Sequence, residues 1–174
     1  APVELDGKTL GIFGYGSIGS RVESIAKAFG MRTIVCTRTP NPLIENPVDA
    51  EQLFKQSDFL TLHAPLTEAT RGIVNEKNIS LMKETAVIIN TARGALVDEN
   101  AVRKALDTGR IAGYAADVVS EEPMKADNPL LGAPNCLLTP HIAWAATETR
   151  QRLLDIVIAN IRCFIAGCPQ NVVS

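Results

Sequence analysis

The sequence contains little that would direct the protein to a membrane or to a nucleic acid. No apolar run approaches the roughly 18 residues that a helix needs to cross a bilayer. We also expect no signal peptide. The net charge is −2, and the lysines and arginines form no polybasic cluster. A basic field that would attract nucleic acid or an anionic membrane is therefore excluded, and a small-molecule partner is the better expectation.

The cysteines are few and follow no recognised pattern. Cys36, Cys136, Cys163 and Cys168 show neither the spacing of metal ligands nor the density of a secreted disulfide scaffold. We therefore expect free thiols, no metal site and a cytoplasmic protein.

What is present is enough apolar material for the core of one domain, since 46% of the 174 residues are hydrophobic. Short β-branched runs alternate with helical segments, which is typical of an α/β domain with a parallel sheet. We expect strands at 9–13, 33–36, 59–62, 86–89, 112–117 and 136–138, and helices at 17–29, near 98–106 and at 147–165. This order predicts a Rossmann-type doubly wound sheet.

The two ends indicate a piece of a longer protein. The chain opens on Ala1 without a methionine, and it closes on 171–174, which resembles the start of a strand. The helix expected at 147–165 carries apolar residues over a wide arc, which is typical of burial on more than one side. We expect residues 1–174 to form a single domain, with part of this helix facing a missing domain or a second subunit.

A glycine motif lies between the first expected strand and its helix, and it reads Gly14-Tyr15-Gly16-Ser17-Ile18-Gly19. Gly14 permits a tight turn, Gly16 lets the backbone approach a pyrophosphate, and Gly19 allows the helix to pack closely. The helix N-terminus at Ser17 and Ile18 favours an anion. Loops produce GxGxxG by chance as well, but its place between a strand and a helix predicts dinucleotide binding.

The end of the second expected strand bears on the choice of cofactor. An acidic residue usually holds the adenosine ribose there, whereas this chain has Thr37 and Arg38. A hydroxyl beside a guanidinium suits a 2′-phosphate, which favours NADP over NAD. The alternative is that Arg38 is a solvated turn residue and the site uses either cofactor.

Further blocks follow the glycine motif: Leu62-His63-Ala64-Pro65-Leu66-Thr67, Ile89-Asn90-Thr91-Ala92-Arg93-Gly94, Asp117 with Glu122-Pro123, and Thr139-Pro140-His141-Ile142-Ala143-Trp144. In these blocks, over nearly the whole chain, the sequence resembles the D-isomer-specific 2-hydroxyacid dehydrogenases. The form His-Ile-Ala-Trp is most similar to the glycerate dehydrogenase and hydroxypyruvate reductase branch. The resemblance implies the NAD(P)-binding domain of a two-domain, metal-independent enzyme that transfers a hydride between NAD(P)(H) and C2 of a small 2-oxo or D-2-hydroxy acid.

That reaction needs a cation for the substrate and a proton donor. Arg93 directly follows an expected buried strand, so it emerges at the carboxyl edge of the sheet, where its planar guanidinium would match a 2-oxo acid. The alternative is a surface-loop arginine. His141, one of two histidines, is the natural acid–base group near neutral pH, and the alternative is a core histidine.

The reaction also needs a group that tunes the donor. The resemblance places it at Glu122, 122 − 93 = 29 positions beyond Arg93, as the carboxylate that orients the His141 imidazole and favours its protonated form. The residues alone leave Glu121 as an equal alternative. The family pattern favours Glu122 because it precedes Pro123.

The resemblance assigns secondary roles in cofactor binding. Thr91 and Ala92 are expected to line the nicotinamide pocket through their backbone, with Arg93 and His141 beside it. Asp117 would bond the carboxamide, or else be a structural turn acid. Pro65 would shape the adenine-side loop.

Other assignments stay open. His63 is expected to be structural. Trp144 has three interpretations: a wall of the substrate pocket, a dimer contact, or plain core. The resemblance implies a homodimer through this domain. It also leaves an alternative function, because a dehydrogenase-like, nucleotide-sensing corepressor carries similar residues.

Overall fold

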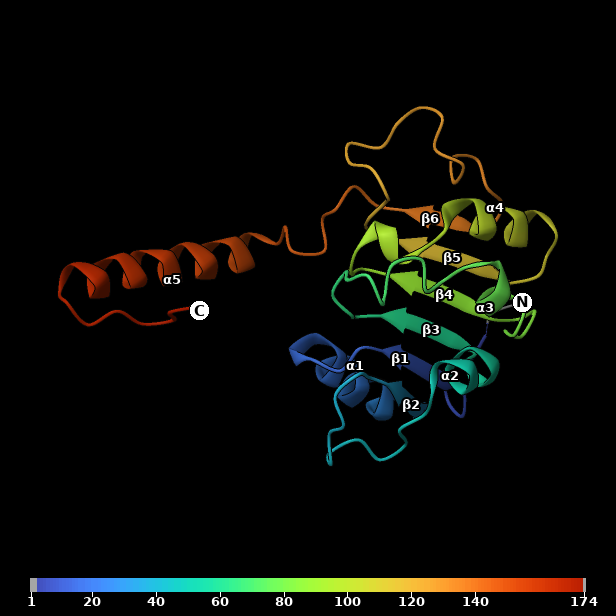
Figure 1. Ribbon diagram of the computed structural model, residues 1–174, viewed down its shortest axis with the longest axis horizontal. Coiled ribbons are helices and arrows are strands. Elements are labelled where there is room, and N and C mark those ends of the chain that lie inside the picture. Colours follow the sequence, from blue (N-terminus) through green and yellow to red (C-terminus); the bar gives the residue numbers. More distant parts are fainter. Residues whose placement is uncertain (1–2, 174) are drawn as a thin grey trace. The chain divides into compact units, whose positions relative to one another are not determined.

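The apolar runs of the sequence form one parallel sheet (Figure 1). The computed structural model describes residues 3–173. Its strands follow the order β2-β1-β3-β4-β5-β6, and every neighbouring pair is parallel. They are β1 (Thr9–Phe13), β2 (Arg32–Cys36), β3 (Phe59–Leu62), β4 (Val87–Asn90), β5 (Gly113–Ala116) and β6 (Cys136–Leu138). This arrangement confirms the expected Rossmann-type α/β fold.

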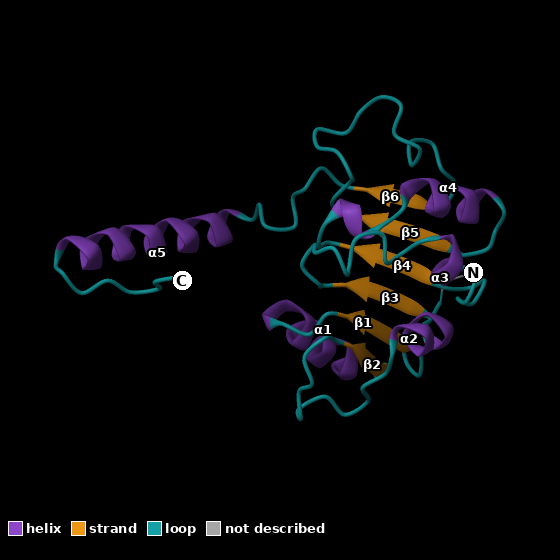
Figure 2. Ribbon diagram, in the orientation of Figure 1, coloured by secondary structure: helices purple, strands orange, loops and turns teal. Residues whose placement is uncertain are grey.

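Helices connect the strands (Figure 2). They are α1 (Ser17–Ala28), α2 (Ala50–Gln56), α3 (Glu76–Ile79), the 3-10 helix η1 (Gly94–Leu96) and α4 (Glu99–Asp107). The expected elements differ from the observed ones by no more than one residue at either end. Sequence reasoning missed α2, α3 and η1, because segments of 7, 4 and 3 residues are too short to show a helical period. Gly30 follows α1 with φ of +74°, the left-handed conformation in which glycine commonly ends a helix.

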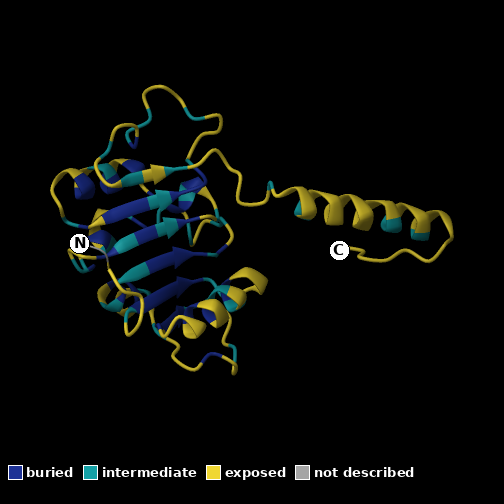
Figure 3. Ribbon diagram, turned by 180° about the vertical axis from the view of Figure 1, so that it is seen from behind, coloured by how far each residue is buried: buried dark blue, intermediate teal, exposed yellow. Residues whose placement is uncertain are grey.

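The core lies on both faces of the sheet (Figure 3). One cluster packs α1 against β1 and β2, with Ile12 fully buried at its centre. The larger cluster packs α2, α3 and α4 against β3, β4 and β5, where Leu60 and Ile88 are fully buried. Two-sided burial explains why these strands read as continuous apolar runs rather than as alternating ones.

The chain divides into two compact units, one ending at Pro140 and one beginning at His141. The second unit contains α5 (Thr147–Ile165), as expected from the sequence. No described residue of α5 is buried, and its large apolar side chains are 38–79% exposed. The covering of this helix by another domain or subunit therefore stays a prediction.

The last residues form no sheet over 171–173, and Ser174 lies outside the described residues, so the strand start expected there is not seen. None of the helices within residues 3–173 is both long enough and apolar enough to span a membrane.

Candidate functional site

The turns that follow β1, β2 and β3 surround a cavity of about 630 Å³. Because β1 lies between β2 and β3, the chain leaves β1 toward one side and later returns on the other. This edge is the topological switch point, where open α/β sheets bind their ligands. Five of the residues expected to bind the cofactor line the cavity: Gly14, Gly16, Thr37, Arg38 and Pro65.

The glycines of the motif have different structural roles. Gly14 has φ of +96°, and a β-carbon there would lie 2.5 Å from the Ala64 backbone nitrogen. A β-carbon on Gly19 would lie 2.4 Å from the Gly14 carbonyl oxygen. On Gly16 it would have no contact within 4 Å among the described residues beyond its chain neighbours. Packing therefore requires Gly14 and Gly19, whereas Gly16 faces open space.

The open space beside Gly16 adjoins the start of α1. This helix begins at Ser17 without a side-chain cap, and its first turn holds no acidic residue. The amides of Ser17 and Ile18 lie in that turn, where the helix itself offers no carbonyl partner. The arrangement suits an anion such as a pyrophosphate.

Two smaller cavities continue along the carboxyl edge of the sheet. One, of about 440 Å³, brings expected cofactor and catalytic residues together from three segments: Ile18, Pro65, Thr91, Ala92 and Arg93. The other, of about 100 Å³, is lined by Thr91 together with Asp117 and Thr139. Asp117 is buried and accepts a hydrogen bond from the Thr139 hydroxyl. The expected residues of the first unit thus follow one edge from β2 to β5.

Arg93 sits on a turn that Asn90 holds in shape. Asn90 is fully buried at the end of β4; its side-chain amide donates to the Arg93 carbonyl oxygen (3.0 Å), and its side-chain oxygen accepts from the Ala92 amide (3.0 Å). The Arg93 side chain is exposed. Sequence reasoning missed Asn90, because only the turn geometry shows that one side chain braces both ends of it.

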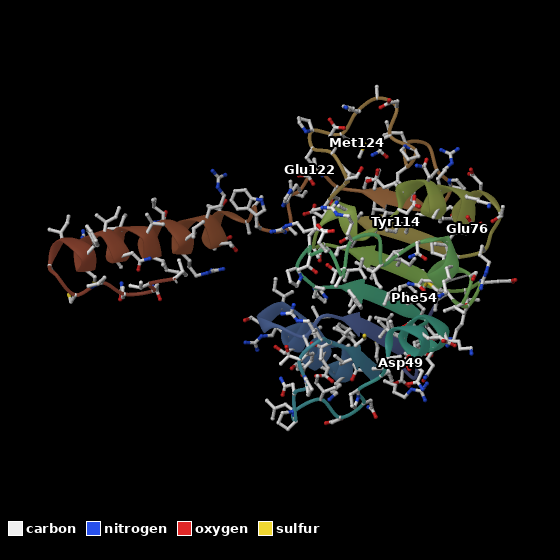
Figure 4. The ribbon with its side chains drawn as sticks, in the orientation of Figure 1. Asp49, Phe54, Glu76, Tyr114, Glu122 and Met124 are labelled. Atoms are coloured by element: carbon white, nitrogen blue, oxygen red, sulfur yellow. The ribbon has the colours of Figure 1, made fainter. Side chains whose placement is uncertain are left out.

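Glu122 lies on the loop that follows β5 (Figure 4). Its Oε1 accepts from the Val119 amide at 3.2 Å. The loop is anchored by Glu99 at the start of α4, whose buried carboxylate accepts from the Ser120 amide and hydroxyl, both at 2.7 Å. Sequence reasoning missed Glu99 as well, since an acidic residue in a first helical turn reads only as a favourable helix start.

The Arg93 turn and the Glu122 loop are packed backbone against backbone. A β-carbon on Gly94 would lie 1.9 Å from the Val119 carbonyl carbon and 2.4 Å from the Ser120 nitrogen. Only glycine permits this approach. The position after Arg93 is therefore set directly by the loop that carries Glu122.

His63 lines both the large cavity and the cavity of about 440 Å³, and Cys36 lines the large one. The His63 Nε2 lies 3.0 Å from the Thr61 hydroxyl, and burial lowers the pKa of its imidazole. Because His63 also lines these cavities, its expected structural role stays a prediction. All four cysteines are free thiols, as expected. Across residues 3–173, no three histidine, cysteine, aspartate or glutamate side chains are grouped as metal ligands.

His141 and Trp144 belong to the second unit. His141 is its first residue and has φ of +54°, which is uncommon for a residue with a side chain. Trp144 is 51% exposed, and the Arg150 guanidinium lies 5.9 Å from the centre of its ring. The pairing of His141 with Glu122 stays a prediction.

Comparison with known proteins agrees with this geometry. Residues 1–143 match the family described as "D-isomer specific 2-hydroxyacid dehydrogenase, NAD binding domain". This chain belongs to that family. It is 48% identical to a hydroxypyruvate reductase of Blautia hydrogenotrophica over 99% of this chain and 55% of the relative. It is 47% identical to a glyoxylate reductase of Aeropyrum pernix, over 99% and 53%.

Solved structures agree on the fold. An acyclic imino acid reductase in complex with NADPH and D-Arg superposes with a TM-score of 0.88 at 39% identity, over 99% of this chain and 55% of that one. A D-lactate dehydrogenase with NAD⁺ from Lactobacillus jensenii superposes with a TM-score of 0.92 at 30% identity, over 100% of this chain and 58% of that one. The chain thus spans about half the length of the relatives it matches, and it is an NAD(P)-binding domain.

Proposed function

We propose that residues 1–174 are the cofactor domain of a reductase that converts small 2-oxo acids, of the glyoxylate and hydroxypyruvate kind, to 2-hydroxy acids with NADPH favoured over NADH. The observation that carries this proposal is the row of cavities along one sheet edge, which links the glycine loop to the turn of Arg93. The names of the relatives support the substrate class. The substrate domain would lie elsewhere in a longer chain, and we propose that the protein forms a homodimer through this domain.

The residues present fit a dinucleotide. The pyrophosphate would lie beside Gly16 and the first turn of α1, where a β-carbon on Gly16 would have no contact within 4 Å among the described residues beyond its chain neighbours. The adenosine would occupy the large cavity, with Thr37 and Arg38 at its 2′-phosphate. Arg38 is exposed and has no ion-pair partner among residues 3–173, which leaves its guanidinium available to a phosphate.

The nicotinamide would lie farther along the edge. The cavity that Thr91 shares with Asp117 would take its carboxamide end, with Ala92 beside it. Asp117 accepts a hydrogen bond from the Thr139 hydroxyl, and its carboxylate would also accept one from the carboxamide of the nicotinamide.

The chemistry divides between the cofactor and three side chains. When bound, the reduced nicotinamide supplies a hydride to C2 of the substrate. Arg93 binds the substrate carboxylate and polarises the carbonyl oxygen. His141 donates a proton to that oxygen, and Glu122 orients and stabilises the imidazolium. Asn90 and Glu99 hold the two loops that carry Arg93 and Glu122.

A two-part experiment tests the proposal. We expect the 174-residue chain to bind NADPH in a calorimetric titration but to reduce glyoxylate and hydroxypyruvate very poorly, because the substrate domain is missing. Joined to its substrate domain, it should turn over at least one of these acids. Absence of NADPH binding would refute the cofactor role, and near-normal turnover by the isolated chain would refute the two-domain assignment.

A further inference from the structure

Glu23 is a buried carboxylate that the proposed reaction does not use. It lies in α1, is 5% exposed, and accepts hydrogen bonds from the Tyr15 phenol and from the Thr33 hydroxyl, the latter at 3.0 Å. Lys27 Nζ lies 3.2 Å from its Oε1. Burial by itself raises the pKa of Glu23, but the hydrogen bonds from Tyr15, Thr33 and Lys27 outweigh it and lower the pKa. Glu23 is therefore ionised at neutral pH.

The partners of Glu23 come from the segments that form the large cavity. Tyr15 lines this cavity from the glycine loop. Thr33 belongs to β2, whose end leads to Arg38 on the cavity rim. Lys27 forms a second ion pair, Nζ to Oε2 at 3.1 Å, with Glu45 on the segment that returns from the rim.

That segment, 37–48, returns to β2 and is hydrogen-bonded to it. The Val35 amide donates to the Asn46 carbonyl oxygen at 3.0 Å, and the Val48 amide donates to the Val35 carbonyl oxygen at 2.9 Å. The Asn46 side-chain amide also donates to the Thr33 carbonyl oxygen at 3.2 Å. The Glu23 carboxylate is thus linked to the glycine loop through Tyr15, to β2 through Thr33, and to the 37–48 segment through Lys27 and its ion pair with Glu45.

We propose that Glu23 is a positioning residue for the adenosine half of the dinucleotide, holding the Tyr15 ring and the Arg38 rim around the large cavity. The inference rests on the proposed function. Glu23 touches no ligand and acts through Tyr15 and Lys27. Glu51 and Lys55 offer a matched control, since they form an ion pair of the same spacing on α2, with both side chains exposed and away from the cavities described above.

The test is a titration of the 174-residue chain with adenosine 2′,5′-bisphosphate and with NADPH. Glu23→Gln should raise both dissociation constants about tenfold, as expected for the loss of a buried charge-assisted hydrogen bond. Tyr15→Phe, which removes the phenol but keeps the ring, should raise them about threefold or more. The double variant should bind no worse than Glu23→Gln, because both changes break the same link. Glu51→Gln should bind like the parent.

A spectroscopic readout separates this role from a general effect on folding. Tyr15 and Tyr114 are the two tyrosines of the chain. The hydrogen bond to Glu23 is the main cause that raises the pKa of Tyr15, whereas burial raises that of Tyr114. In Glu23→Gln, tyrosinate absorbance from Tyr15 should therefore appear at lower pH than in the parent.

The outcomes are distinguishable. A parent chain that binds neither probe refutes the proposed function, and this inference with it. A parent that binds while folded Glu23→Gln binds equally well, or losses that simply add in the double variant, refutes the positioning role alone. If Glu23→Gln does not fold, Tyr15→Phe decides, since unchanged binding of adenosine 2′,5′-bisphosphate by that variant overturns the inference.

Discussion

Gly14 and Gly16 belong to one motif, yet replacing each by alanine should have different consequences: Gly14→Ala should lower stability, and Gly16→Ala should lower affinity for the cofactor. In Gly14→Ala, the residue must hold φ of +96°, and its β-carbon would lie 2.5 to 2.7 Å from backbone atoms of Ala64 and His63. Left-handed backbone costs an L-residue about 1–2 kcal/mol. Overpacking adds about 1–3 kcal/mol. Because the obstructing atoms are backbone, they cannot rotate away, and we expect about 2–5 kcal/mol of lost stability.

Gly16→Ala should leave the fold intact. Its backbone is extended, with φ of −101°, and the new methyl group would meet no atom within 4 Å. Its effect on stability should stay within about 1 kcal/mol. The methyl group would, however, occupy the space proposed for the pyrophosphate. Losing a charge-assisted backbone contact costs about 1.5–3 kcal/mol, which corresponds to a roughly 10- to 150-fold higher dissociation constant for NADPH.

Urea unfolding followed by circular dichroism, and calorimetric titration with NADPH, measure both effects on the same samples. Gly14→Ala should lower the free energy of unfolding, and Gly16→Ala should lower affinity alone. Unchanged NADPH binding by Gly16→Ala would refute the pyrophosphate position. An unchanged free energy of unfolding in Gly14→Ala would refute the packing argument.

Three further outcomes are expected. Arg38→Ala should weaken the binding of NADPH more than that of NADH, by about 1–3 kcal/mol. An unchanged ratio of the two dissociation constants would show that Arg38 is a solvated turn residue. In the two-domain enzyme, His141→Ala should lower kcat about 100- to 10,000-fold, and adding Glu122→Gln should cost little more; fully additive losses would make Glu122 structural. In Asp58→Asn, the free energy of unfolding should fall less than in the parent as the pH decreases. Urea unfolding measured between pH 2 and 7 would test this.

The direction of the Asp58 effect follows from its surroundings. Burial by itself raises the pKa of this carboxyl, but hydrogen bonds from Lys83 and from the Thr9 amide outweigh it and lower the pKa. A carboxyl with a lowered folded-state pKa stabilises the protein fully above its unfolded value of about 3.9. That contribution is lost as the pH falls through the lower folded value. If the free energy of unfolding fell equally with decreasing pH in Asp58→Asn and in the parent, the lowered pKa of Asp58 would be refuted.

Much of the fold could be predicted from local pattern. Most residues of β1 to β5 are buried, so these strands appear as short apolar runs between turn residues. Gly30 marks the end of α1 through its backbone alone. The glycine motif was interpretable because β1 and α1 flank it directly. Arg93 was found because it follows a strand, which places it at the sheet edge without knowledge of any distant contact.

The fold class, the family and the proposed ligand-binding edge of the sheet could all be predicted from local sequence patterns. The polar groups that hold this edge in place could not, because they come from distant segments. From local sequence alone, Glu23 would be expected on the exposed surface of its helix and Glu99 as an acidic residue that favours a helix start. In the structure both are buried. Their partners Thr33 and Ser120 lie 10 and 21 positions away. Local pattern governs backbone geometry, whereas a buried carboxylate is stabilised by hydrogen bonds that chain folding brings from distant segments.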